Sequence, residues 1–96
     1  MGNLETTLWE LFLRGDSRIS VLESFQNDPH TYVKVFVDDG THGITVQEVT
    51  SYPYSFCNNE GAALKFTIRK ALEKVADIIR ARAYILIEAK LVAEFS

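Results

Sequence analysis

The stretch TYVKVFVDDGTHGITVQEVT, residues 31–50, decides the fold of this 96-residue chain. Apolar and polar side chains alternate through residues 31–37 and again through residues 43–50, which is the pattern of strands with one buried face. Between them stands Asp39-Gly40, a dipeptide that strongly favours a two-residue type I′ turn. The stretch therefore predicts an antiparallel hairpin.

A two-residue loop at Asp39-Gly40 fixes the partners along the two strands. The predicted pairs are Val37 with His42, Phe36 with Gly43, and Val35 with Ile44. The faces then agree, because the valines of the first strand share one side with the apolar residues of the second. We also expect the ring of Phe36 to lie over the bare backbone of Gly43.

Two further elements are predicted before the hairpin. Asn3 can cap a helix through LETTLWELFLR that ends at Gly15. Its apolar stripe is made of Leu4, Leu8, Leu11 and Phe12. Residues 18–25, RISVLESF, alternate as a strand through Ile19, Val21 and Phe25, and a second helix is the alternative. Asn27-Asp28-Pro29 then connects this strand to the hairpin, which predicts a three-stranded antiparallel meander.

A long helix is predicted after the meander. Pro53 ends the third strand, and Asn58 or Asn59 is placed to cap a helix that begins near Gly61. As far as Arg82, the apolar residues keep to one arc, which comprises Leu64, Ile68, Ala71, Leu72, Val75, Ile78 and Ile79. Residues 84–95 lose that division and also alternate as a strand. Continuation of the helix is favoured because no stop signal intervenes, and a terminal strand is the alternative.

The chain is therefore expected to form one α+β domain, residues 1–96, with an N-terminal helix, a three-stranded antiparallel meander and a long C-terminal helix in the order αβββα. Hydrophobic residues make up 47% and charged residues 24%, which is an ordinary globular composition. A chain this short buries only about 60–65% of its unfolded surface, so a second subunit would add needed core.

Charge and cysteine content narrow the classes of partner. A net charge of −3 and a pI near 5.3 provide no clustered positive field for nucleic acid or an anionic membrane. Cys57, the single cysteine, excludes an intrachain disulfide and a cysteine-rich zinc cage. No stretch has the form of a secretory signal or the length of a membrane span. We expect a cytoplasmic protein with no membrane association and no cofactor.

The segment VDDGTHG, residues 37–43, comes nearest to a catalytic signature. Asp38, Asp39 and His42 would point to different sides of a tight hairpin, so a turn explains them better than a metal site. Cys57 has no base and orienting group prepared beside it in the sequence. We therefore expect no metal site, no catalytic residues and no enzymatic activity.

Tyr32, Lys34 and Phe36 project from the strand face opposite the valines, in an aromatic, basic, aromatic pattern that can stack bases on a sheet. Asp38 on that same face and the net negative charge oppose this, and a covering first helix would explain the aromatics. The order of elements is similar to that of double-stranded RNA-binding domains. Their second helix begins with a lysine-rich phosphate clamp, however, where this chain has NNEGAALK with Glu60. Single-stranded nucleic-acid binding is the second hypothesis.

Surplus aromatic residues point to a protein partner. Trp9 widens the stripe of the first helix, and Tyr52, Tyr54 and Phe56 crowd one loop. These four residues are the predicted partner-binding site.

The apolar end of the chain points to self-association. An exposed patch of that size usually marks an interface. The predicted oligomer interface is Tyr84, Ile87, Leu91 and Phe95. The first hypothesis is therefore a non-enzymatic adaptor, inhibitor or accessory subunit, of phage or bacterial type, that forms a homodimer through its C-terminal segment.

Overall fold

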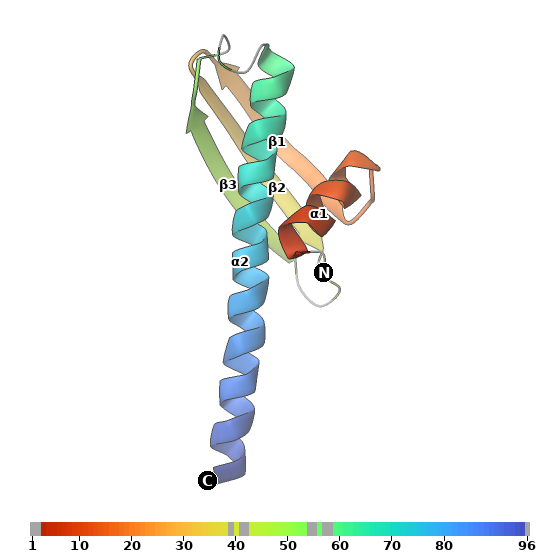
Figure 1. Ribbon diagram of the computed structural model, residues 1–96, viewed down its shortest axis with the longest axis vertical. Helices are drawn as coiled ribbons and strands as arrows, with labels where there is room; N and C mark the ends of the chain where they lie inside the picture. The colour runs from red at the N-terminus through yellow and green to blue at the C-terminus, as the bar shows by residue number, and fades with distance from the viewer. Residues whose placement is uncertain (1–2, 39, 41–42, 54–55, 57–58, 96) are drawn as a thin grey trace.

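The computed structural model describes residues 3–38, 40, 43–53, 56 and 59–95, and for residues 83–95 it describes the backbone alone. Its elements are α1 (Leu4–Leu13), β1 (Ile19–Asn27), β2 (His30–Asp38), β3 (Gly43–Ser51) and α2 (Glu60–Phe95), as Figure 1 shows. The predicted order αβββα is confirmed. The helix alternative for residues 18–25 is wrong, because this segment belongs to β1.

Helix α1 begins and ends where the sequence predicts. The Asn3 side chain accepts a hydrogen bond from the N–H of Thr6 at 2.7 Å, which satisfies one free donor of the first turn. Gly15, at φ 69°, adopts the left-handed conformation that commonly ends helices. Arg18 then donates two hydrogen bonds of 2.9 Å to Asp16 and holds the pKa of that carboxyl well below its usual range.

The strands form an antiparallel sheet in the order β1-β2-β3, but the hairpin register differs from the predicted one. Val37 pairs with Ile44, two residues beyond its predicted partner, so the connection spans residues 39–42 and the two-residue turn is wrong. The Asp38 carboxylate accepts a hydrogen bond from the N–H of Gly40 at 2.9 Å, which favours this wider loop. Because the shift is two residues, every side chain of β3 keeps its predicted face.

The predicted contact between Phe36 and Gly43 is confirmed, although the two residues are not direct partners. Phe36 pairs with Thr45, and Gly43 lies diagonally across from it. A Cβ atom added to Gly43 would lie 2.5 Å from Cζ of Phe36. The ring therefore covers the glycine backbone.

A bulge alters the faces of β1. The register shifts between Val21 and Glu23, so Leu22 is the extra residue. As a result Phe25 pairs with Tyr32 and lies on the sheet face opposite Val21, although simple alternation placed Phe25 and Val21 together.

One face of the sheet packs against α2 and builds the core. Its buried apolar residues are Ile19, Val33, Val35, Val37, Ile44 and Val46 of the sheet, Ile68, Ala71, Leu72, Val75 and Ala76 of α2, and Leu8 of α1. The remaining members of the predicted apolar arc, Leu64, Ile78 and Ile79, pack against this cluster. The predicted core faces of α2, β2 and β3 are confirmed, whereas that of β1 holds only before the bulge.

Three threonines lie where α2 crosses β2 and β3. The fully buried Thr67 hydroxyl donates to the carbonyl of Ala63 at 2.9 Å, so it accepts from the Thr50 hydroxyl at 2.6 Å. Among the described atoms, the buried Thr31 hydroxyl has no hydrogen-bond partner.

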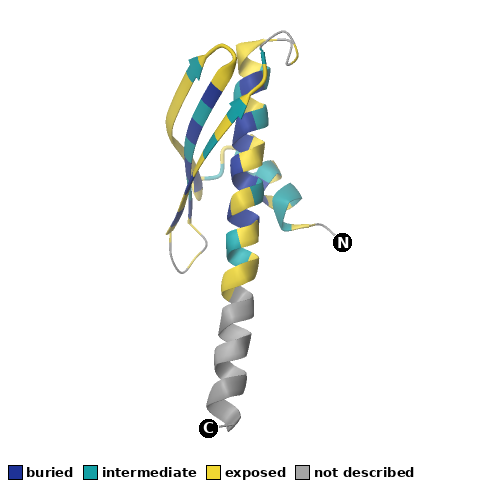
Figure 2. Cartoon of the chain, turned by 90° about the vertical axis from the view of Figure 1, so that its left-hand side faces the viewer, coloured by how far each residue is buried: buried dark blue, intermediate teal, exposed yellow. Residues whose placement is uncertain are grey.

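Helix α1 lies on the same side of the sheet as α2, as Figure 2 shows. Leu8 enters the core, and the Glu5 carboxylate accepts a hydrogen bond from Nη2 of Arg80 at 2.8 Å. The expectation that the first helix covers Tyr32 and Phe36 is therefore wrong. Within the described chain, no helix lies over their face of the sheet.

Helix α2 extends far past the sheet (Figure 1). Its 36 residues correspond to about 54 Å of helix, close to the 57 Å long dimension of the molecule. The radius of gyration is 16.0 Å, against about 12.5 Å for a compact chain of this length. The terminal strand alternative is wrong, because the helix continues through Phe95. Within the described part of the chain, no helix combines the length and apolarity needed to cross a membrane.

Candidate interaction site

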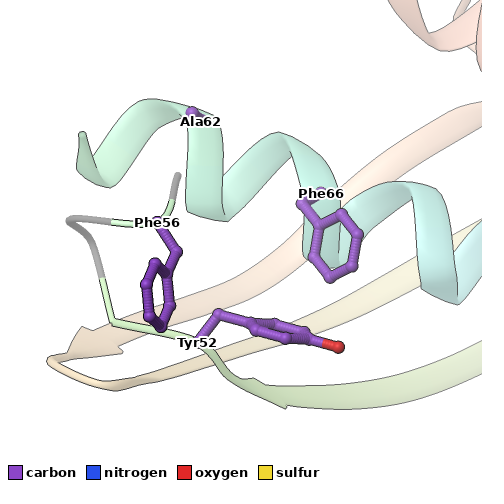
Figure 3. A pocket seen from close by; sticks show the side chains of 4 residues that line it. All are labelled: Tyr52, Phe56, Ala62 and Phe66. Carbon is purple, nitrogen blue, oxygen red and sulfur yellow. The ribbon is translucent and has the colours of Figure 1, made fainter. Parts of the chain in front are cut away.

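An aromatic pocket lies where the end of β3 meets the start of α2 (Figure 3). It has a volume of about 560 Å³ and is lined by Tyr52, Phe56, Ala62 and Phe66. The rings of Tyr52 and Phe66 meet edge to face, with centroids 5.2 Å apart and planes at 86°. The N–H of Phe56 donates to the carbonyl of Pro53 at 2.9 Å, which turns the chain at the rim. Tyr52 is 50% exposed and Phe56 78%, so large apolar surfaces face outward.

Two hydrogen bonds fix the start of α2, one by capping the helix and one by joining it to the sheet. The Asn59 side chain accepts from the N–H of Ala62 at 2.8 Å, so the predicted cap at Asn59 is confirmed. The side-chain amide of Gln26, near the end of β1, donates to the carbonyl of Glu60 at 2.6 Å. The α2 wall of the pocket is therefore tied to the sheet.

The pocket continues as a groove along β3. This groove has a volume of about 470 Å³ and is lined by residues 48–52 together with Phe66 and Lys70. The Lys70 ammonium lies 5.4 Å from the centroid of the Phe66 ring. One turn further along α2, Lys74 forms an ion pair of 2.7 Å with Glu48. The groove is thus apolar at the pocket end and charged farther along.

The structure brings together two of the four predicted partner-binding residues. Tyr52 and Phe56 line the pocket, whereas Tyr54 lies outside the described residues. Trp9 lies elsewhere, on α1, where the Arg69 guanidinium sits 5.5 Å from its ring and helps to join α1 to α2. Trp9 is therefore not part of this pocket.

Sequence reasoning missed the contribution of α2 to the site. Phe66 and Lys70 are one helical turn apart, and Phe66 falls on the arc that Lys70 and Glu73 make charged. A single aromatic ring among charges, outside the apolar stripe, was the available signal that this side of the helix makes a second contact.

The outer face of the sheet carries the residues of the nucleic-acid hypothesis. Tyr32, Lys34 and Phe36 are half-buried there. Tyr32 pairs with Phe25 on one side and Val49 on the other, so an apolar row crosses all three strands. Phe25 is 62% exposed. This aromatic face is more extensive than the sequence pattern predicted.

Acidic side chains offset the charge of Lys34 on that face. Lys34 pairs with Glu23 across the strands, and the Tyr32 hydroxyl donates to the Glu23 carboxylate over a long 3.5 Å. Partial burial raises the pKa of Tyr32, and the neighbouring Glu23 charge adds to this. A neutral phenol, Glu23 opposite Lys34 and Asp38 at the end of β2 leave little positive field.

The predicted oligomer residues Tyr84, Ile87, Leu91 and Phe95 lie on α2, in the part for which only the backbone is described. Asp39, His42 and Cys57, considered above for chemistry, lie outside the described residues. Among the residues that are described, no three His, Cys, Asp or Glu side chains gather as a metal site would require.

A comparison of the chain with protein-family models, curated proteins and solved structures found no match. Function must therefore be argued from the residues and their geometry.

Proposed function

We propose that this is a non-enzymatic interaction protein, an adaptor, inhibitor or accessory subunit, that forms a homodimer through the end of α2 and binds another protein at the aromatic pocket. The phage or bacterial cytoplasm is the setting we propose for it. The observation that carries the proposal is the continuation of α2 to Phe95, well past the sheet.

Arg80 of α2 bonds to Glu5 of α1, and beyond it the helix runs on past the sheet (Figure 1). The remaining 15 residues of the helix correspond to about 22 Å. Their sequence from residue 83 is AYILIEAKLVAEF, in which Glu88, Lys90 and Glu94 are the charged residues. A helix that is apolar on nearly every side needs a cover.

A second copy of the same helix is a fitting cover. Tyr84, Ile87 and Leu91 are spaced by three and four residues, which is the spacing of a coiled-coil seam, and Phe95 lies one helical turn beyond Leu91. Isologous pairing lets each copy cover the other with the same residues.

The test is analytical ultracentrifugation of the wild type, Ile87→Asp and Lys90→Asp. Burying a carboxylate in an apolar seam should weaken dimerisation by roughly 100-fold or more. Lys90→Asp is the matched control, since it introduces the same side chain on the same helix at a charged position, and it should stay largely dimeric. A wild type that remains monomeric at high concentration would refute self-association.

Single-stranded nucleic-acid binding at Tyr32, Lys34 and Phe36 is the second candidate. The open aromatic face, with Phe25 beside Tyr32, favours it. Glu23 next to Lys34 opposes it. Fluorescence anisotropy with labelled oligopyrimidines should show salt-sensitive binding that Lys34→Glu abolishes and Phe36→Ala reduces. Absence of binding at low salt would remove this candidate.

A further inference from the structure

The outer side of β3 is an open sheet edge. The strand order β1-β2-β3 leaves one side of β3 without a partner strand in the described chain. An edge strand presents unpaired N–H and C=O groups, which recognise another extended backbone whatever its sequence. Because α2 packs over β2 and β3, a strand added there would lie against a helical wall.

The spacing of side chains on that wall matches an extended chain. Phe66 of the pocket and Lys70 of the groove are four residues apart on α2, a rise of about 6 Å. Side chains on one face of a strand repeat every two residues, about 6.8 Å. Neighbouring same-face residues of an added strand would therefore meet Phe66 and then Lys70.

The chemistry at these two positions differs. At the first position, the pocket of Tyr52, Phe56 and Phe66 accepts a bulky apolar side chain. At the second, the Lys70 ammonium contacts the Glu73 carboxylate only at 3.6 Å, and both side chains are more than 40% exposed. A partner carboxylate can displace so weak a pairing at little cost.

The cation one turn further on is already paired. Lys74 is 2.7 Å from Glu48, whose side chain is only 16% exposed. Among the cations of this wall, Lys70 is therefore the one that best complements an acidic residue of a partner.

The direction of the added strand sets the order of the two residues. Strand β3 runs toward Tyr52 and the pocket, while α2 runs back from the pocket past Phe66 to Lys70. An antiparallel addition, which continues the pattern of this sheet, starts at the pocket and proceeds toward Lys70.

We infer that the β3 groove binds an extended segment of another protein as a fourth strand, with a bulky apolar residue followed two positions later by an acidic residue. This rests on the proposed function, since it names the partner chemistry of the same aromatic pocket. The apolar residue enters the pocket, the carboxylate meets Lys70, and the backbone pairs with β3.

The test uses fluorescein-labelled heptapeptides on a threonine and valine scaffold, titrated by anisotropy against the full chain. A peptide with Phe-x-Glu should bind, and reversal to Glu-x-Phe should weaken binding by about tenfold or more. N-methylation of the backbone amides that face β3 should abolish binding, because it removes the strand hydrogen bonds. NMR shifts on addition of peptide should concentrate in residues 48–52 and in the first three turns of α2.

A charge exchange provides the sharpest control. Lys70→Glu should lose affinity for Phe-x-Glu by about tenfold and regain it for Phe-x-Lys. Lys65→Glu, the same change at an exposed lysine of α2 outside the groove lining, should leave both affinities unchanged.

Three results would overturn the inference. Equal binding of both peptide orders, insensitive to N-methylation, would show that the pocket takes an apolar group without strand addition. NMR shifts at β3 that grow with protein concentration in the absence of peptide would show that the edge pairs with a second copy of the chain. No binding at millimolar peptide concentration would show that the groove does not bind a segment of this kind. The same titrations on Ile87→Asp separate this inference from the dimer, because this variant should still bind the single peptide as a monomer. A wild type that binds the peptide but stays monomeric at high concentration would refute self-association alone.

Discussion

Gly43→Ala and Phe36→Ala, made singly and together, test the contact that fixes the outer face of the hairpin. The added methyl would lie 2.5 Å from Cζ of Phe36, whereas carbon atoms pack best at about 3.5–4.0 Å. The ring must therefore retreat by about 1 Å or more, and overpacking of this kind costs about 1–3 kcal/mol. Alanine in a strand is otherwise about 0.5–1 kcal/mol better than glycine.

These two effects predict a change of sign. In the wild-type background Gly43→Ala should lower the free energy of unfolding by about 0.5–2 kcal/mol. In the Phe36→Ala background, where no ring stands in the way, the same change should raise it by about 0.5–1 kcal/mol. The expected coupling energy is thus about 1–3 kcal/mol, roughly 4–8 °C in Tm for each kcal/mol.

Urea unfolding followed by circular dichroism gives the free energy of unfolding of the wild type, the two single variants and the double variant. All four are measured at one protein concentration, because a dimer would make stability concentration-dependent. Unchanged m-values would show that the compactness of the two states is unaltered. If Gly43→Ala has the same effect in both backgrounds within about 0.5 kcal/mol, the ring does not cover the glycine and the contact is refuted.

Four further substitutions test the core and the α1–α2 contact. Thr31→Val should raise the free energy of unfolding by about 1 kcal/mol, because the buried hydroxyl has no partner, whereas Thr67→Val should lower it by a similar amount; a loss at Thr31 would reveal a hidden hydrogen bond. Leu72→Ala, at a fully buried site, should cost about 2.7–5 kcal/mol in urea unfolding, and a cost below about 1 kcal/mol would contradict that burial. The hydrogen bond from Arg80 lowers the pKa of Glu5 from 4.5 to about 2, so its stabilisation is complete above pH 4.5 and is lost as the pH falls toward 2. NMR titration should find that Arg80→Gln returns the Glu5 pKa toward 4.5, and an unchanged pKa would exclude the contact.

Alternation in the sequence predicts faces well and register poorly. Side chains repeat every two residues, so the two-residue shift that pairs Val37 with Ile44 leaves every inward valine inward. The bulge at Leu22 is the opposite case, because one extra residue moves Phe25 to the other face. Neither feature changes the apolar pattern that predicted the core, which explains why the core was predictable when the loop length was not.

The groove depends on information that local patterns do not contain. Tyr52 and Phe56 stand out as a loop aromatic cluster, but Phe66 and Lys70 join them only because α2 packs mainly over β2 and β3. That choice of edge follows from how α1 and α2 share one face of the sheet. The periodicity of a single helix gives its buried arc and not its position along the sheet.

The groove and the proposed dimer seam lie at opposite parts of α2, which leads to a test of both together. Phe66 and Ile87 are separated by 21 residues, about 32 Å along the helix. Pairing of two copies through the end of α2 would therefore leave each groove open, and the dimer would be bivalent. A tandem peptide with two Phe-x-Glu motifs on a flexible linker should then bind the wild type at least about tenfold more tightly than a single motif. Ile87→Asp should abolish that gain while keeping the single-motif affinity, and Lys90→Asp should preserve both. Equal anisotropy-derived affinities for single and tandem peptides, over linkers that reach from about 40 to 100 Å, would show that two grooves do not belong to one particle.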